Sequence, residues 1–232
     1  MKHEHFVVQS PATPAKQLLL LFHGVGDNPV AMGQIGSWFA PHFPDALVVS
    51  IGGPAPSGPY QGREWFSVAG VTEENRQQRV NAIMPTFVEV VRYWQKHSGV
   101  PANATALIGF SQGAIMALEG VKAEAELASR VVAFNGRYAQ LPQAASTATT
   151  IHLIHGDDDR VIDVKHAFDA SEALTQLGGD VTLDVLDDLG HAIDDRSIQI
   201  ARDHLRYTVP KHYFDEALSG GKPKDDDIVE FL

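Results

Sequence analysis

The sequence predicts an α/β fold in which a mostly parallel central sheet is flanked by helices on both faces. Short apolar runs alternate with longer segments of helical periodicity along the 232 residues. Most of these runs are almost continuously apolar, which is typical of parallel strands covered on both sides. One domain over residues 1–218 is expected, followed by an acidic tail at 219–232.

The individual elements follow from the same periodicities. Strands are expected at 5–9, 17–24, 46–52, 104–110, 130–136, 149–156 and 180–188, and helices at 73–97, 112–128, 165–178 and 195–209. Pro85 predicts a kink or local break in the longest helix. Gly178 and Gly179 predict a helix C-cap. Residues 52–70, rich in Gly and Pro, are expected to form a long loop.

Composition excludes several classes of protein. The chain has no Cys, which excludes disulfides, thiolate metal sites and Cys nucleophiles. A formal net charge of −11 argues against nucleic acid or an anionic membrane as partner. The N-terminal sequence lacks an apolar signal region, and the run LLLLF at 18–22 is too short to cross a bilayer. We therefore expect a cytoplasmic protein without membrane insertion, and interpret His3 and His5 as solvated residues rather than metal ligands.

The first candidate for chemistry is Ser111, in the pentapeptide GFSQG at 109–113. The pattern G-x-S-x-G between a strand and a helix is that of a nucleophile elbow, in which small neighbours let strand and helix approach closely. The alternative is an ordinary Gly-Ser turn that joins a strand to a helix. The rest of the sequence has to decide between these interpretations.

A serine nucleophile needs a base, and the base needs an orienting acid. LIHGDDDRVID at 153–163 supplies three acids after a strand, and DDLGHAID at 188–195 supplies His191 after the next strand. The order Ser, acid, His fits, and both segments follow predicted strand ends, where open α/β sheets build their sites. Spacing leaves the choice among the acids at 157–159 open, and His191 alone could be an ordinary loop residue. His152 and His155 are interpreted as structural.

An oxyanion formed during acyl transfer needs backbone N–H donors. One is expected from Gln112, directly after the candidate nucleophile, and the other from Val25 in the turn HGVGD after an early strand. The alternative for this turn is a tight turn, possibly for phosphate. It lacks the Lys-Ser/Thr of a P-loop and the third Gly of a dinucleotide site.

Five motifs together resemble the phospholipase/carboxylesterase family of α/β-hydrolases: LFHGVGDN, GREWFSV, IGFSQGAIMAL, IHGDDDRVI and LGHAI. The resemblance covers about residues 15–207 and implies the α/β-hydrolase fold. Its pattern H-G-x-x-D-x-V selects Asp159 as the orienting acid, and its histidine falls on His191. It also implies that Trp65 and Phe66 bind substrate as part of an acyl-pocket wall. The sequence departs from the family pattern at two places. Ser67 stands where relatives commonly have Asp, and the chain extends beyond Pro210, past the compact family core.

The expected function is that of a serine carboxylesterase acting on short- to medium-chain esters, with a small-molecule ester or thioester as its partner. Ser111 would attack, His191 would transfer protons, Asp159 would orient His191, and no metal or organic cofactor is needed. The Gln112 side chain is expected to be replaceable, since only the backbone N–H of this residue is expected to bind the oxyanion. Alternatives are an acyl-protein thioesterase or lysophospholipase with a long apolar channel, and a catalytically silent hydrolase-fold binding protein. No helix face predicts an oligomeric state.

Overall fold

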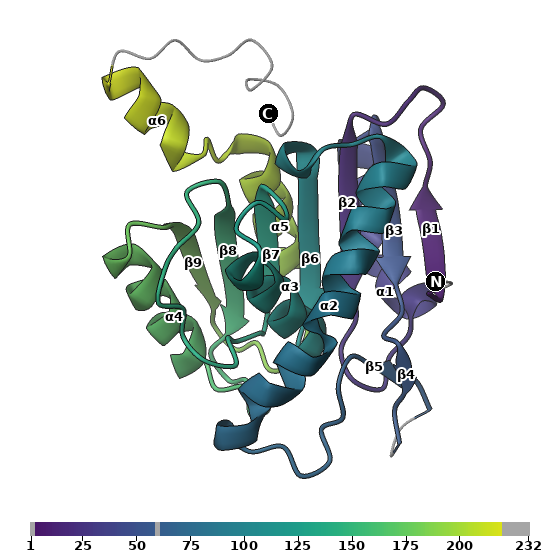
Figure 1. Cartoon of the computed structure of the whole chain (residues 1–232), viewed down its shortest axis with the longest axis vertical. Coiled ribbons are helices and arrows are strands. Elements are labelled where there is room, and N and C mark those ends of the chain that lie inside the picture. The colour runs from purple at the N-terminus through teal and green to yellow at the C-terminus, as the bar shows by residue number, and fades with distance from the viewer. Residues whose placement is uncertain (1–2, 59–60, 220–232) are drawn as a thin grey trace.

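A computed structural model describes residues 3–58 and 61–219 of the chain (Figure 1). Its main sheet has the strand order β1-β3-β2-β6-β7-β8-β9, with β1 antiparallel to β3 and the other neighbours parallel. The strands are β1 (His5–Gln9), β2 (Gln17–Phe22), β3 (Ala46–Ile51), β6 (Thr105–Phe110), β7 (Arg130–Phe134), β8 (Thr150–Gly156) and β9 (Asp180–Leu186). The predicted fold class and all seven predicted strands are confirmed.

The central strands are buried on both faces. Alternate side chains of β2 enter two separate cores: Leu18 and Leu20 one of them, Leu19 and Leu21 the other. This division follows from the two-residue period of a strand, and it explains why the sequence here is apolar without interruption. The edge strands β1 and β9 are only partly buried.

Helices cover both faces of the sheet (Figure 1). They are α1 (Pro29–Phe39), α2 (Glu73–Ser98), α3 (Gln112–Ala123), α4 (Lys165–Gln176), α5 (Asp195–Tyr207) and α6 (Lys211–Leu218), with 3₁₀ turns η1 (Ala40–His42) and η2 (Ala102–Ala104). Buried side chains of α2, α3 and α4 belong to one core, and those of α1 and α5 to the other. No helix within residues 3–58 and 61–219 is both long and apolar enough to cross a membrane.

Three local expectations can be compared with the structure. α2 runs through Pro85 without interruption, so of the predicted kink or local break the break is wrong, and the kink stays a prediction. The C-cap after α4 is confirmed, since Gly178 has φ +75° and the Gly179 amide bonds the Leu174 carbonyl at 2.8 Å. Within the predicted loop 52–70, two strands of two residues each, β4 (Ala55–Pro56) and β5 (Arg63–Glu64), pair antiparallel.

Two helices, α1 and α6, were not predicted from the sequence. α1 contains Gly33 and Gly36, which lower helix propensity. Both glycines are needed for close packing, because a Cβ would lie 2.5 Å from the Phe6 ring at Gly33 and 3.1 Å from Val8 at Gly36. Tertiary contact thus overrides the local signal. Beyond Ser219 the expected acidic tail lies outside the described residues, and the proposed domain extent stays a prediction.

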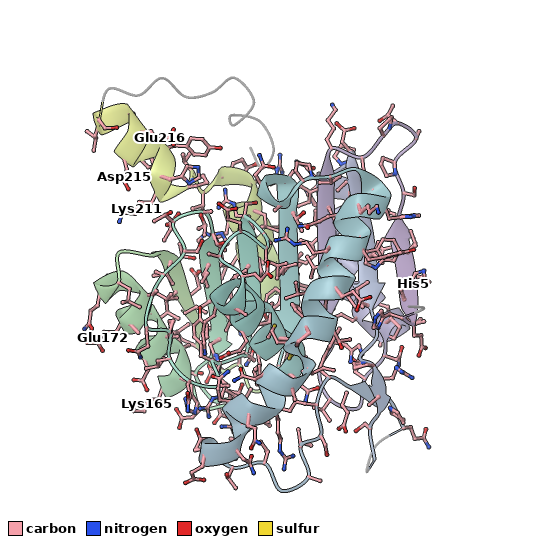
Figure 2. All side chains as sticks on the ribbon, in the orientation of Figure 1. His5, Lys165, Glu172, Lys211, Asp215 and Glu216 are labelled. Atoms are coloured by element: carbon pink, nitrogen blue, oxygen red, sulfur yellow. The ribbon has the colours of Figure 1, made fainter. Side chains whose placement is uncertain are left out.

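The parallel strands end at the lower edge of the sheet in Figure 1, where α2 and α4 begin. Figure 2 places Lys165, the first residue of α4, at this edge. Lys211, Asp215 and Glu216 of α6 lie at the opposite end of the molecule (Figure 2). A site built from strand-end loops is therefore far from α6.

Candidate active site

Ser111 lies on a strained turn between β6 and α3. Its backbone has φ +53° and ψ −116°, a conformation that residues other than glycine rarely adopt. A Cβ at Gly113 would lie 2.0 Å from the Phe22 carbonyl oxygen, and one at Gly109 would lie 2.4 Å from the Gly113 backbone. The positions two residues before and two residues after the serine therefore require glycine.

The structure brings three of the predicted residues into one hydrogen-bonded chain. His191 Nε2 lies 2.9 Å from Ser111 Oγ, and His191 Nδ1 lies 2.7 Å from Asp159 Oδ2. Because the ionised carboxylate can only accept, Nδ1–H donates to it and Nε2 is left to accept from the serine hydroxyl. The Phe110 ring packs against the imidazole, with centroids 5.0 Å apart.

Asp159 differs from its two acidic neighbours in burial. It is 7% exposed, whereas Asp157 and Asp158 are exposed residues. Its Oδ1 accepts from the amides of Val161 and Ile162 at 2.8 and 2.9 Å. Burial acts to raise the pKa of Asp159, but hydrogen bonds from Asn135, His191 and these amides outweigh it and hold the pKa below its ordinary value. The carboxylate is thus kept ionised beside the imidazole.

Asn135 is a site residue that the sequence analysis missed. It follows β7 with φ +47°, and its Nδ2 donates to Asp159 Oδ2 at 2.7 Å and to the Gly190 carbonyl at 3.1 Å. It therefore ties the orienting acid to the loop that carries His191. The signal was the Asn-Gly pair at a strand end, because Asn tolerates the left-handed region.

The two histidines of β8 have structural partners. His155 lies 3.3 Å from Asp159, but its Nε2 has a shorter contact, 2.7 Å, with the Ile162 carbonyl, to which it donates. His152 is fully buried, with Nδ1 2.8 Å from Thr182 Oγ1. Burial lowers the pKa of both imidazoles. These positions fit the interpretation of both as structural.

The turn after β2 lies directly beside Ser111. A Cβ at Gly24 would lie 3.2 Å from the Ser111 Cβ, and Gly24, Val25 and Gln112 all line the same cavity. His23 is fully buried behind the turn, where its Nε2 accepts from the Gly53 amide at 2.9 Å and its Nδ1 lies 2.6 Å from the Gly24 carbonyl. The two amides expected to bind the oxyanion thus belong to neighbouring backbone segments, and their role stays a prediction.

The Gln112 side chain makes contacts that argue against its expected replaceability, which stays a prediction. It is 2% exposed, its Oε1 accepts from the Trp65 amide at 2.7 Å, and its Nε2 donates to the Phe66 carbonyl at 2.7 Å. The side chain therefore fixes the loop before α2 against the nucleophile elbow. Sequence reasoning considered only the backbone of this residue.

A cavity of about 590 Å³ opens over the Ser111 hydroxyl. Its apolar lining consists of Val25, Phe66, Val68, Val71, Phe110, Ile115, Val161 and Ile162. Trp65 is not among the lining residues: it is 1% exposed and packs against Phe22 and Phe87 in the core. Trp65 therefore supports the cavity from behind, and of the two predicted substrate-binding residues only Phe66 reaches it.

The cavity also has a polar part, which the sequence analysis did not predict. Arg76, Arg137, His166 and Asp27 all line it. Within residues 3–58 and 61–219, no group of three or more His, Asp or Glu side chains could hold a metal ion.

Comparison with known proteins assigns the family. The family model described as phospholipase/carboxylesterase matches residues 3–209. The chain belongs to this family. Esterase YpfH of Escherichia coli is 76% identical over 232 residues and covers both chains completely. Together these findings confirm the predicted class of enzyme, a carboxylic ester hydrolase.

More distant relatives match in sequence or in fold. Acyl-protein thioesterase 1 of Neurospora crassa is 25% identical over 217 residues, which cover 83% of this chain and 87% of the relative. The crystal structure of esterase PE8 has a TM-score of 0.79 at 27% identity, with 90% of this chain and 100% of that one covered. The Bacillus cereus carboxylesterase has a TM-score of 0.74 at 17% identity, covering 93% and 94%.

Proposed function

We propose that the chain is a serine carboxylesterase that hydrolyses short- to medium-chain esters through Ser111, His191 and Asp159. The observation that carries the proposal is the continuous hydrogen-bonded chain from Ser111 Oγ through the imidazole to Asp159, at 2.9 and 2.7 Å, at the floor of a cavity. This arrangement favours catalysis over the silent binding protein considered from the sequence.

In the proposed mechanism, His191 Nε2 removes the hydroxyl proton as Ser111 Oγ attacks the ester carbonyl. Asp159 keeps the proton on Nδ1, so that the lone pair of Nε2 faces the serine, and it stabilises the imidazolium that forms. The amides of Val25 and Gln112 donate to the tetrahedral oxyanion. The imidazolium then protonates the leaving alcohol, and water attacks the acyl-enzyme by the same route in reverse.

The proposed acyl length rests on the size and lining of the cavity. About 590 Å³ is within the usual range for small-molecule sites, and its apolar residues suit an alkyl chain of modest length. Phe66, held in place by Gln112, would contact that chain. The lack of Cys supports the cytoplasm as the proposed location, because a reducing compartment does not favour disulfides.

A serine-directed fluorophosphonate tests the nucleophile. The wild-type protein should become labelled at Ser111, and Ser111→Ala should lose labelling together with roughly 10⁴-fold or more of kcat. Ser37→Ala is the matched control, because Ser37 is an exposed serine on α1. Equal labelling of wild type and Ser111→Ala would contradict the proposed mechanism.

A series of 4-nitrophenyl esters and matched acyl thioesters from two to sixteen carbons, about the range of natural acyl chains, tests the substrate class. We expect kcat/KM to peak at short or medium chains. A sharp optimum at the longest chains, or a strong preference for thioesters, would favour the acyl-protein thioesterase or lysophospholipase alternative.

A further inference from the structure

One side of the active-site cavity is cationic. Arg76 from the first turn of α2, Arg137 from the loop after β7 and His166 from α4 all line the cavity that contains Ser111. The mechanism proposed above uses none of them. Arginine side chains beside an apolar acyl site need an explanation, because binding a neutral ester does not require them.

A single carboxylate pairs with both arginines. Glu73 accepts from Arg137 at 2.7 and 3.0 Å and from Arg76 at 2.5 Å. The side chain of Glu73 is 63% exposed, whereas those of Arg76 and Arg137 are 15% and 11% exposed. Hydrogen bonds from these arginines hold the pKa of Glu73 at about 2. Two guanidinium groups against one carboxylate leave this cluster with one net positive charge.

Donors remain available within the cluster. Among the described residues, the Arg76 side chain hydrogen-bonds only to Glu73, so most of its five guanidinium N–H groups face no protein acceptor. Arg137 donates to His166 Nε2 at 2.9 Å. Because that nitrogen accepts, the neutral imidazole carries its proton on Nδ1 and offers one more donor.

Arg137 and His166 lie on one side of the nucleophile, and Glu73 ties Arg76 to Arg137 on the same side. Ser111 follows β6, Arg137 follows the next strand β7, and α4 with His166 follows β8. Asp27, the carboxylate that also lines the cavity, follows β2 on the other side of β6. With strands about 4.8 Å apart, the loops after β2 and β7 start roughly 10 Å from each other. Among the described residues, Asp27 forms no ion pair with Arg76 or Arg137, whose carboxylate partner is Glu73.

We propose that the preferred substrates carry an anionic group, a carboxylate or phosphate, which binds to Arg76, Arg137 and His166 while the scissile carbonyl lies at Ser111. The planar, permanently charged guanidinium group suits either anion. Val71 and Ile162 of the cavity lining would contact the apolar spacer between the two groups. This inference rests on the proposed function, since it assigns a substrate class to the same site.

Length-matched substrate pairs test the proposal. The 4-nitrophenyl monoester of adipic acid is compared with its neutral methyl ester, which places the charge in the acyl part. Butyrate esters of phenol, 4-hydroxybenzoate and 4-hydroxyphenyl phosphate place a carboxylate or phosphate in the leaving group. The wild type should favour at least one anionic ester by about tenfold or more in kcat/KM, and added salt should reduce this preference. The pair that shows the preference identifies the position and type of the anion.

The variant Arg76→Gln should lower the anionic-to-neutral ratio by about tenfold, mainly through KM, and Arg76→Lys should restore part of it. Arg92→Gln is the matched control, because it removes the same charge from the same helix at a side chain paired with Glu124. It should leave the ratio unchanged. Thermal unfolding of each variant separates misfolding from lost binding.

Two results would overturn the inference: no preference for any anionic ester in the wild type, or an equal ratio in wild type and Arg76→Gln. Failure of the proposed function looks different. In that case neither the anionic nor the neutral esters would be hydrolysed in a manner that depends on Ser111. Hydrolysis that depends on Ser111 but ignores charge contradicts only the anion site.

Discussion

Replacing Gln112 with Ala tests whether its side chain positions the active-site loop. The variant keeps the backbone N–H at 112 but removes the hydrogen bonds to the Trp65 amide and the Phe66 carbonyl, both 2.7 Å long. Each hydrogen bond contributes about 1 kcal/mol, and the void left by a buried side chain adds to the loss. We expect the free energy of unfolding to fall by about 2–4 kcal/mol. Because Phe66 lines the cavity, kcat/KM should also fall roughly 10- to 100-fold.

Gln95→Ala is the matched control for this experiment. Gln95 is also a buried glutamine, 7% exposed, and its Nε2 donates to the Leu127 carbonyl at 2.8 Å and to Thr105 at 3.2 Å. It does not line the cavity. Urea unfolding should show a similar loss of stability for both variants, whereas ester hydrolysis should be impaired only in Gln112→Ala. Equal kcat/KM in the two variants, at a temperature where both are folded, would refute the positioning role.

Three further variants test other contacts. Burial acts to raise the pKa of Asp159, and the hydrogen bond from Asn135 helps to keep it low. Asn135→Asp should therefore move the acid limb of the kcat/KM profile to higher pH. An acid limb at the same pH as in the wild type would contradict this. Burial keeps His152 neutral in the folded state, with its pKa well below 6.5, while the unfolded chain binds a proton below that pH. Stability should therefore fall as pH drops below 6.5, by about 1.4 kcal/mol per unit from this residue. Urea unfolding at several pH values should show a shallower slope in His152→Gln. In Gly113→Ala the new Cβ would lie 2.0 Å from a carbonyl oxygen, so the free energy of unfolding should fall by about 3 kcal/mol or more. Gly58→Ala is its control and should show no such loss, because no atom lies within 4 Å of a Cβ there.

The strands were predictable because each is specified by local apolar periodicity, which a sheet buried on both faces reinforces. α1 was not, because Gly33 and Gly36 contribute to stability only after β1 packs against them. Pro85 shows the opposite case: the local rule predicts a kink or a break, and α2 continues through it without a break. In α2 the capping interactions between Thr72 and Asn75 and the apolar face buried in the core favour one continuous helix.

The candidate site divides in the same way. Chain order and strand ends were sufficient to group Ser111 and His191, because parallel strands bring their carboxyl ends to one edge. The choice of Asp159 over its neighbours needed the family pattern, since burial distinguishes them only in three dimensions. The role of the Gln112 side chain depends on a contact 47 residues away in sequence, which no local pattern contains.

The geometry of the candidate site follows from the register of four neighbouring strands. β6, β7, β8 and β9 lie side by side and lead, in that order, to Ser111, Asn135, Asp159 and His191. A register shift of one residue would displace a side chain by about 3.3 Å. Such a displacement would break the hydrogen bonds of the site, which are 2.7 and 2.9 Å long. Bonds that join these loops, such as that from Asn135 to the Gly190 carbonyl, stabilise the sheet edge and the hydrogen-bonded chain of the candidate site together. Mutations at this edge should therefore affect stability and activity jointly, and only controls matched in burial, such as Gln95→Ala, separate the two.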